Sequence, residues 1–188
     1  MSAFVRSSSG VPLRRWIAAL VVGTACALAP RSGLPNVTSP ASVAGRLPFF
    51  AARDLSGRGR SASELNGRRS LLVVVPDAEA GDAAERWARS VHELGADVEG
   101  SMFTLVALRL PFFVPDGIVF DRARSRTPAS RWSHTWLDRD GHVQDAFGLR
   151  GGSRPWVFVL DRDGRVLLRA CSDADASSVR VAIALLRG

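Results

Sequence analysis

The chain has 188 residues, 46% of them hydrophobic and 23% charged. This is enough apolar sequence for one domain with a buried core, and it excludes a chain that is disordered throughout. The 25 basic residues are all arginine and face 18 acidic residues, for a formal net charge of +7. Because these arginines alternate with acidic residues and form no basic cluster interleaved with aromatic side chains, we expect no nucleic-acid partner.

Residues 1–29 have the organisation of an export signal. Arg6, Arg14 and Arg15 precede the apolar stretch 16–29, and no acidic residue accompanies them. As a helix this stretch spans only about 21 Å, short of the roughly 30 Å hydrocarbon core of a bilayer. We therefore expect a signal peptide over 1–29 and a periplasmic or secreted protein. Membrane association is expected only if the signal is retained or Cys26 is lipidated, and Arg14 and Arg15 leave a twin-arginine signal open.

Residues 30–46 are rich in proline, serine and glycine, which predicts a flexible linker between the signal and a single domain over 47–188.

The first half of this domain alternates a strand with a helix. The apolar run Leu71–Val75 predicts a buried strand. A helix follows over 82–94, where Asp82 and Glu85 resemble a capping box. Its apolar residues form one stripe, at Ala84, Trp87, Val91 and Leu94.

The second half begins with a buried strand over 103–110 and an irregular section over 111–131 that contains three prolines. Trp156–Leu160 and Val166–Arg169 flank a D-R-D-G-R turn and predict a β-hairpin. A last helix is expected to start near Asp173. The order of elements predicts an α/β fold with a mixed central sheet flanked by helices.

An ordered series of short motifs resembles thioredoxin-like and redoxin domains. The first half of the domain contains LPFF at 47–50, DLSG at 54–57 and SELNGR at 63–68. The second half contains DRDG at 138–141, FGL at 147–149 and SRPWVFVLDRDG at 153–164. The resemblance implies a thioredoxin-like fold that opens with an N-terminal hairpin, and a proline at 155 that is usually cis and faces the active site. Periplasmic YtfJ-type proteins, which lack the usual cysteine motif, are the most similar in outline.

Thioredoxin-type chemistry needs a thiolate at the start of the first helix, where the helix N-terminus lowers the thiol pKa. The corresponding stretch, 75–82, contains no cysteine, serine or threonine, and instead carries Asp77, Glu79 and Asp82. Capping of the helix explains these carboxylates, and a site for a divalent cation or cationic ligand is the alternative. We expect no redox-active cysteine pair and no peroxidatic cysteine.

Cys171 is the one cysteine expected in the mature chain. It is interpreted as an inert thiol, with an intermolecular disulfide or an atypical redox role as alternatives. The histidines have no metal-ligand spacing, so no metal and no cofactor is expected.

Aromatic residues around Pro155 could line a groove for a partner, although core packing also explains them. The candidate groove and partner-binding residues are Asp77, Glu79, Trp136, Arg154, Pro155 and Trp156.

These observations predict a non-catalytic, exported protein that acts by binding an envelope protein or a peptide. The alternatives are an atypical thiol-redox protein that uses Cys171 and a structural component anchored in the envelope.

Overall fold

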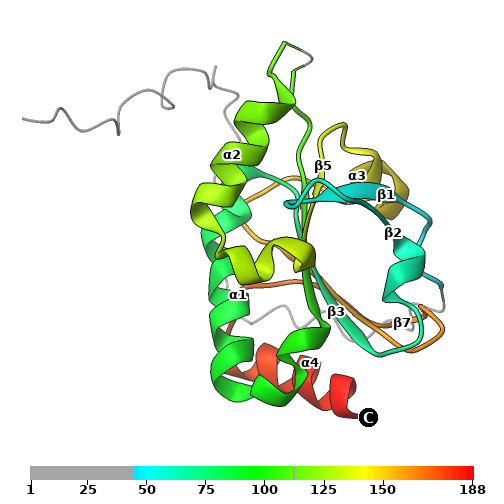
Figure 1. Ribbon diagram of the computed structural model, residues 1–188. Coiled ribbons are helices and arrows are strands. Elements are labelled where there is room, and N and C mark those ends of the chain that lie inside the picture. Colours follow the sequence, from blue (N-terminus) through cyan, green and yellow to red (C-terminus); the bar gives the residue numbers. More distant parts are fainter. Residues whose placement is uncertain (1–44, 112) are drawn as a thin grey trace, which may run out of the picture. The chain divides into compact units, whose positions relative to one another are not determined.

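The computed structural model describes residues 45–111 and 113–188, which form a seven-stranded sheet in the order β2-β1-β5-β4-β3-β6-β7 (Figure 1). In chain order the strands are β1 (Ala51–Asp54), β2 (Gly59–Ser61), β3 (Ser70–Val75), β4 (Met102–Ala107), β5 (Thr135–Asp138), β6 (Trp156–Leu160) and β7 (Val166–Cys171). The central strands β3, β4 and β5 are parallel, whereas β1, β2, β6 and β7 pair antiparallel with their neighbours. The predicted mixed sheet with an N-terminal hairpin is therefore confirmed.

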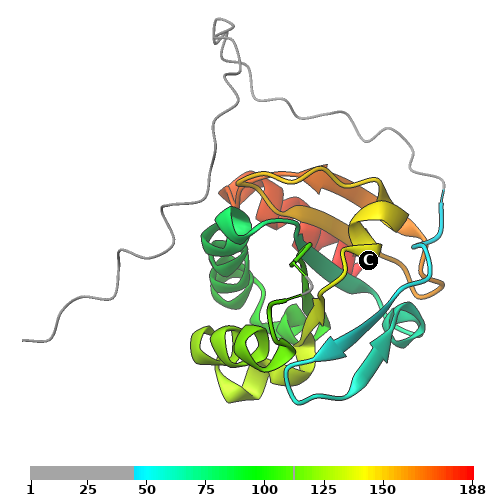
Figure 2. The same cartoon turned by 90° about the horizontal axis from the view of Figure 1, so that it is seen from above.

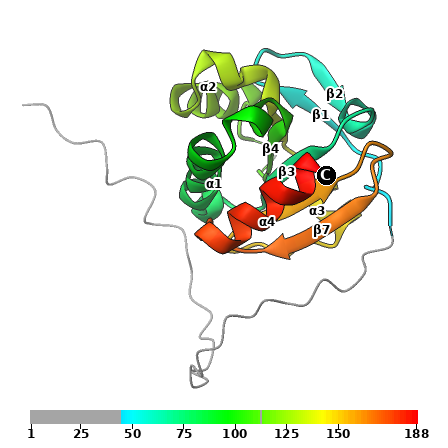
Figure 3. The same cartoon turned by 90° about the horizontal axis from the view of Figure 1, so that it is seen from below.

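Helices cover both faces of the sheet. The α-helices are α1 (Gly81–Leu94), α2 (Asp116–Arg126), α3 (His142–Phe147) and α4 (Ala176–Arg187), and the short 3-10 helices are η1 (Ala62–Leu65), η2 (Ala78–Ala80), η3 (Ala96–Ser101) and η4 (Ala129–His134). Helices α1 and α4 lie side by side on one face, which we call the α1 face (Figure 3). Helix α3 and η1 pack on the opposite face, which we call the α3 face.

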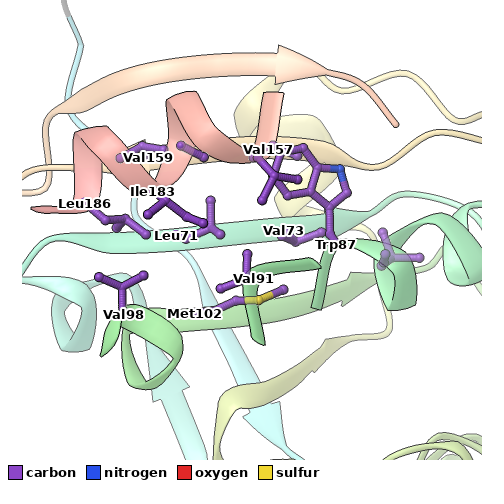
Figure 4. Packing of buried hydrophobic residues seen from close by; sticks show 14 of the residues in the cluster. Leu71, Val73, Trp87, Val91, Val98, Met102, Val157, Val159, Ile183 and Leu186 are labelled. Carbon is purple, nitrogen blue, oxygen red and sulfur yellow. The ribbon is translucent and has the colours of Figure 1, made fainter. Parts of the chain in front are cut away.

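Alternation along the strands separates two hydrophobic clusters. Strand β3 is buried at every position, because Leu71, Val73 and Val75 pack on the α1 face while Leu72 and Val74 pack on the α3 face. Figure 4 shows the cluster of the α1 face, in which side chains of α1, α4 and η3 meet those of β3, β4 and β6. The cluster of the α3 face is rich in aromatic residues, with Phe50, Phe103, Trp136, Phe147 and Phe158.

The predicted stripe of α1 is confirmed for three of its four residues. Ala84, Trp87 and Val91 are buried, but Leu94, in the last turn, is 44% exposed. The predicted capping box is wrong, because the helix begins at Gly81, its cap is Ala80, and no side chain bonds to the cap.

Two segments differ from the sequence-based expectation. Residues 111–131 were expected to be irregular, yet they contain α2 and the first residues of η4. Pro115 precedes α2, where the missing amide hydrogen costs nothing, and the helix buries none of its residues, so it has no apolar stripe to reveal it. The last helix begins at Ala176 and not near Asp173, because Asp175 is its cap.

The expected signal peptide, most of the linker, Cys26 and Phe112 lie outside the described residues. None of the described helices has the length and apolar character needed to span a membrane.

Candidate functional site

Four segments that are distant in sequence meet at one edge of the sheet, namely the edge where β3 and β7 end and β6 begins. Strand β3 ends at this edge, where Val74 pairs with Trp156 at the start of β6. Trp156 in turn pairs with Cys171 at the end of β7, and the Ser172 amide donates to the Pro155 carbonyl at 3.3 Å. The edge therefore gathers the start of α1, the loop before β6 and the end of β7.

The carboxylates before α1 act as local caps. The Asp77 carboxylate accepts a hydrogen bond from the Glu79 amide at 3.4 Å and caps η2. It also borders the loop before β6, since its Oδ2 lies 3.6 Å from the point where a Cβ on Gly151 would stand. Both carboxylates are exposed. Among the described residues no group of three or more His, Cys, Asp or Glu side chains could hold a metal ion.

The residues around Pro155 point in different directions. Pro155 is buried, and its peptide bond is trans, unlike the cis form that the resemblance implies. Arg154 is exposed, with its Nε 3.6 Å from the Asp173 carboxylate. Trp156 packs against the cluster of the α3 face, and the Arg169 guanidinium stacks 5.0 Å from its ring centre.

The interpretation of Trp136 as a groove residue does not fit its position. Its side chain is 1% exposed and lies among Phe50 and Phe103 in the cluster of the α3 face. It lies on β5, and β4 and β3 separate that strand from β6. Alternation in β5 places Trp136 toward the core, so the aromatic residues do not gather beside Pro155 as the sequence suggested.

Cys171 lies at the same edge as the start of α1 but on the other face of the sheet. It pairs directly with Trp156, and directly paired residues project to the same side, so its thiol lies on the α3 face. The thiol is exposed. Burial raises the pKa of Cys171, and Asp173 raises it further, whereas Arg154 opposes the change.

A cavity lies on the α1 face between α1 and α2. Figure 2 shows these two helices next to each other beside the sheet. Its volume is about 440 Å³, within the range of roughly 300–1,000 Å³ found for small-molecule sites. Its floor is formed by residues of β3, β4 and β5 that project to this face, namely Val75, Thr104, Val106, Thr135 and Leu137. No sequence motif indicated this cavity, because it depends on a helix that the sequence did not reveal.

The charged residues of the cavity wall are mainly basic. Arg122 and Arg126 belong to α2, Arg131 belongs to η4, and Glu85 of α1 is the acidic member. Arg131 forms an ion pair with Glu99 at 3.4 Å. The cavity thus combines an apolar interior with a positively charged wall.

Comparison with known proteins finds one curated relative and many solved structures that are similar to this chain. No protein-family model matches the chain. A thiol peroxidase from Corynebacterium glutamicum is 26% identical over 106 residues, which covers 56% of this chain and 64% of that protein. The chain thus aligns with less than two thirds of the length of this curated relative.

Solved structures show similarity over more of the chain. An exposed lipoprotein thioredoxin from Streptococcus pneumoniae has a TM-score of 0.54 at 12% identity, covering 72% of this chain and 98% of that one. A thio-disulfide isomerase from Thermus thermophilus has a TM-score of 0.53 at 19% identity, covering 75% and 94%. At such identities the likeness establishes the fold, and the closer resemblance to YtfJ-type proteins stays a prediction. The described part of this chain has a thioredoxin-like fold, with no cysteine at the start of its first long helix.

Proposed function

We propose that the chain is a non-catalytic, thioredoxin-like protein that acts by binding and not by thiol exchange. The observation that carries the proposal is the cavity between α1 and α2. It lies against η2 at Ala78 and against the first turn of α1 at Gly81 and Ala84, which is where a thioredoxin-type protein needs its reactive thiolate. In this chain the same position offers apolar surface and space for a ligand.

The placement of Cys171 supports binding over catalysis. The helix dipole that activates a thioredoxin thiol acts within the first turn of its helix, and Cys171 lies on the opposite face of the sheet from α1. Because its pKa is raised, only a small fraction of the thiol is ionised at neutral pH.

Thiol assays test this proposal directly. We expect the protein to reduce insulin disulfides and to consume hydrogen peroxide no faster than the buffer, and Cys171→Ser to behave identically. Activity in the wild type that disappears in Cys171→Ser would overturn the binding-only proposal. A Ser172→Ala variant, which leaves the thiol in place, controls for structural effects of substitution at the end of β7.

One observation favours a second candidate, an atypical thiol-redox function. Cys171 is exposed at the edge of the sheet, and nearby Arg154 favours its thiolate. The name of the peroxidase relative fits such a role. In this case Arg154→Gln would slow alkylation of Cys171 by iodoacetamide. The Cys171 thiolate would also attack a partner's disulfide, forming a mixed disulfide and releasing the partner's other sulfur as a thiolate, and Cys171→Ser would form no such adduct.

We extend the proposal to export from the cytoplasm. The basic start and apolar stretch of residues 1–29 support it, as does the description of the pneumococcal structural neighbour as an exposed lipoprotein. Mass spectrometry of the mature N-terminus tests this step. It distinguishes an intact chain, a chain that begins after the signal and a chain acylated at Cys26, the form that an envelope-anchored component requires.

A further inference from the structure

We propose that the cavity between α1 and α2 binds a single-chain amphiphile with an anionic head, such as a fatty-acid carboxylate. This inference rests on the proposed binding function and specifies its ligand. The apolar interior would hold the hydrocarbon chain, and arginines of α2 would hold the anion.

Apart from Glu85, η2 and α1 present only small side chains to the cavity. Ala78, Gly81, Ala84 and Ala88 line it from the α1 side. Beneath them Thr104, Val106 and Leu108 remain only partly buried, although they follow one another on the same side of β4 and its extension. A strand face in the middle of a sheet normally packs against larger side chains, so this floor is apolar surface without a filling group.

Helix α2 forms a wall of the cavity without filling it. The structure shows no buried residue in this helix. Val119 and Ala123 line the cavity, yet they are only partly buried, and Ile118, at the cavity margin, is 62% exposed. Apolar side chains in this arrangement gain burial when a hydrocarbon chain occupies the space, and removal of apolar surface from water favours binding.

The charges on the wall select an anionic head. Among residues 45–111 and 113–188, the guanidinium groups of Arg122 and Arg126 have no hydrogen-bond or ion-pair partner, whereas Arg124 on the same helix is bonded to the Leu55 carbonyl at 2.7 Å. Planar guanidinium groups match the geometry of a carboxylate. Glu85 is the single acidic group of the lining, so the unpaired charge on the wall is predominantly positive.

The polarity and size of the cavity favour an amphiphile over a peptide. A peptide would bring amide groups that need hydrogen-bond partners, and each unsatisfied buried amide costs free energy. Apart from the charged residues, the lining offers only the hydroxyls of Thr104, Thr127 and Thr135 as side-chain partners. The volume of about 440 Å³ lies toward the small end of the range for ligand sites, which suits one acyl chain better than two.

Three probes with the same alkyl chain and different head groups test whether the cavity selects an anionic head. Dodecanoate, dodecanol and dodecyltrimethylammonium would each compete with the neutral fluorophore N-phenylnaphthylamine for the full-length protein at neutral pH. We expect dodecanoate to displace the fluorophore at the lowest concentration and the ammonium compound at the highest. Equal or tighter binding of the ammonium compound would overturn the assignment, because Glu85 would then be the dominant partner of the head.

Paired variants locate the site. Arg122→Gln with Arg126→Gln is expected to weaken dodecanoate binding about tenfold and to leave dodecanol unchanged, since a charge-assisted bond is lost only for the anion. Arg180→Gln, an exposed site on α4, removes a charge away from the cavity and should leave both affinities unchanged. Equal weakening by Arg180→Gln would show a general charge effect and would overturn the assigned site.

A cavity-filling variant and the pattern of probe binding show whether the ligand class alone is wrong or whether the cavity is not the functional site. Ala88→Leu places a larger side chain in the cavity and is expected to abolish binding of all the probes. Ala96→Leu makes the same change at an exposed position of η3 and should bind normally. If dodecanol and the fluorophore bind the wild type but dodecanoate has no advantage, only the ligand class is wrong. If no apolar probe binds, both this inference and the cavity as the functional site are wrong.

Discussion

Asp175 shows how a single side chain determines where a helix begins. Its carboxylate accepts hydrogen bonds from the amides of Ser177 at 3.0 Å and Ser178 at 2.9 Å, and from both hydroxyls. The hydroxyls of Ser177 and Ser178, together with these amides, lower the pKa of Asp175 to about 2. The ionised carboxylate is therefore the form that stabilises the start of α4.

We predict that Asp175→Ala lowers the free energy of unfolding by about 1 kcal/mol at pH 7, the usual cost of losing such a cap. Urea denaturation measures the change. Asp163→Ala removes an exposed carboxylate from the turn between β6 and β7 and is expected to change stability by less than about 0.5 kcal/mol. An equal loss in both variants would indicate a general charge effect and would contradict the capping role.

The positions of individual residues also explain why the candidate site could be predicted only in part from the sequence. Trp136 lies in β5 and Trp156 lies in β6, and the local sequence does not show how far apart these two strands lie in the sheet. The order of the sheet places β4 and β3 between them, and both side chains pack on the α3 face. Arg122 and Arg126 were missed because unpaired arginines in an arginine-rich chain give no signal until their surroundings are known.

At the scale of elements, α1 and α2 differ in how they are stabilised. Trp87 anchors α1, since its ring is buried and its Nε1 donates to the Ser172 carbonyl at 3.1 Å. Helix α2 buries no residue of its own, and the partly exposed Arg124 connects it to the Leu55 carbonyl. Helices with few buried apolar contacts open at lower free-energy cost than core elements.

We predict that amide hydrogens of α2 exchange faster than those of the central turns of α1, around Trp87 and Val91. Hydrogen exchange followed by mass spectrometry measures this difference. Addition of dodecanoate should slow exchange in α2 and leave α4 unchanged, because α4 does not line the cavity. Exchange in α2 as slow as in α1 without ligand would contradict the view that this helix covers an unfilled space.

The sequence revealed α1 and concealed α2 for the same physical reason. Periodic apolar residues mark a helix only when one of its sides is buried, as Ala84, Trp87 and Val91 are. Helix α2 instead follows Pro115 and has its apolar residues partly exposed around a cavity. The apolar pattern of residues 111–131 therefore predicts an irregular segment.

At the scale of the whole molecule, groups with lowered pKa values link stability to pH. Burial lowers the pKa of His134 below its ordinary value of 6.5, and Arg131 and Arg68 lower it further. Burial alone would raise the pKa of Asp54, but hydrogen bonds from Ser56, Arg60 and Arg58 outweigh it and hold the pKa below the ordinary 3.8. In each case the unfolded chain binds the proton more readily than the folded chain does, so stability is lost as the pH falls.

We predict two declines in the free energy of unfolding as the pH is lowered. The first begins as the pH falls through about 6.5, when the unfolded chain protonates at His134, and the second begins below about pH 4, when it protonates at Asp54 and Asp175. Urea denaturation at a series of pH values measures both. His134→Gln should remove the first decline, and His142→Gln, at an exposed position, should retain it. A wild-type profile that stays level between pH 7 and 5 would contradict the role of His134.

The sequence by itself determined the fold class, the hairpin of β6 and β7 and the lack of a cysteine before α1, because apolar periodicity, turn residues and residue identity are local properties. The hairpin of β1 and β2 was expected from the family resemblance alone. Only the tertiary structure decided which residues share a site. It placed Trp136 in the core, Cys171 on the opposite face from α1, and the arginines of α2 beside an apolar cavity. These relations depend on strand order and on helix packing across the sheet, which join residues far apart in the chain and leave no periodic trace in it.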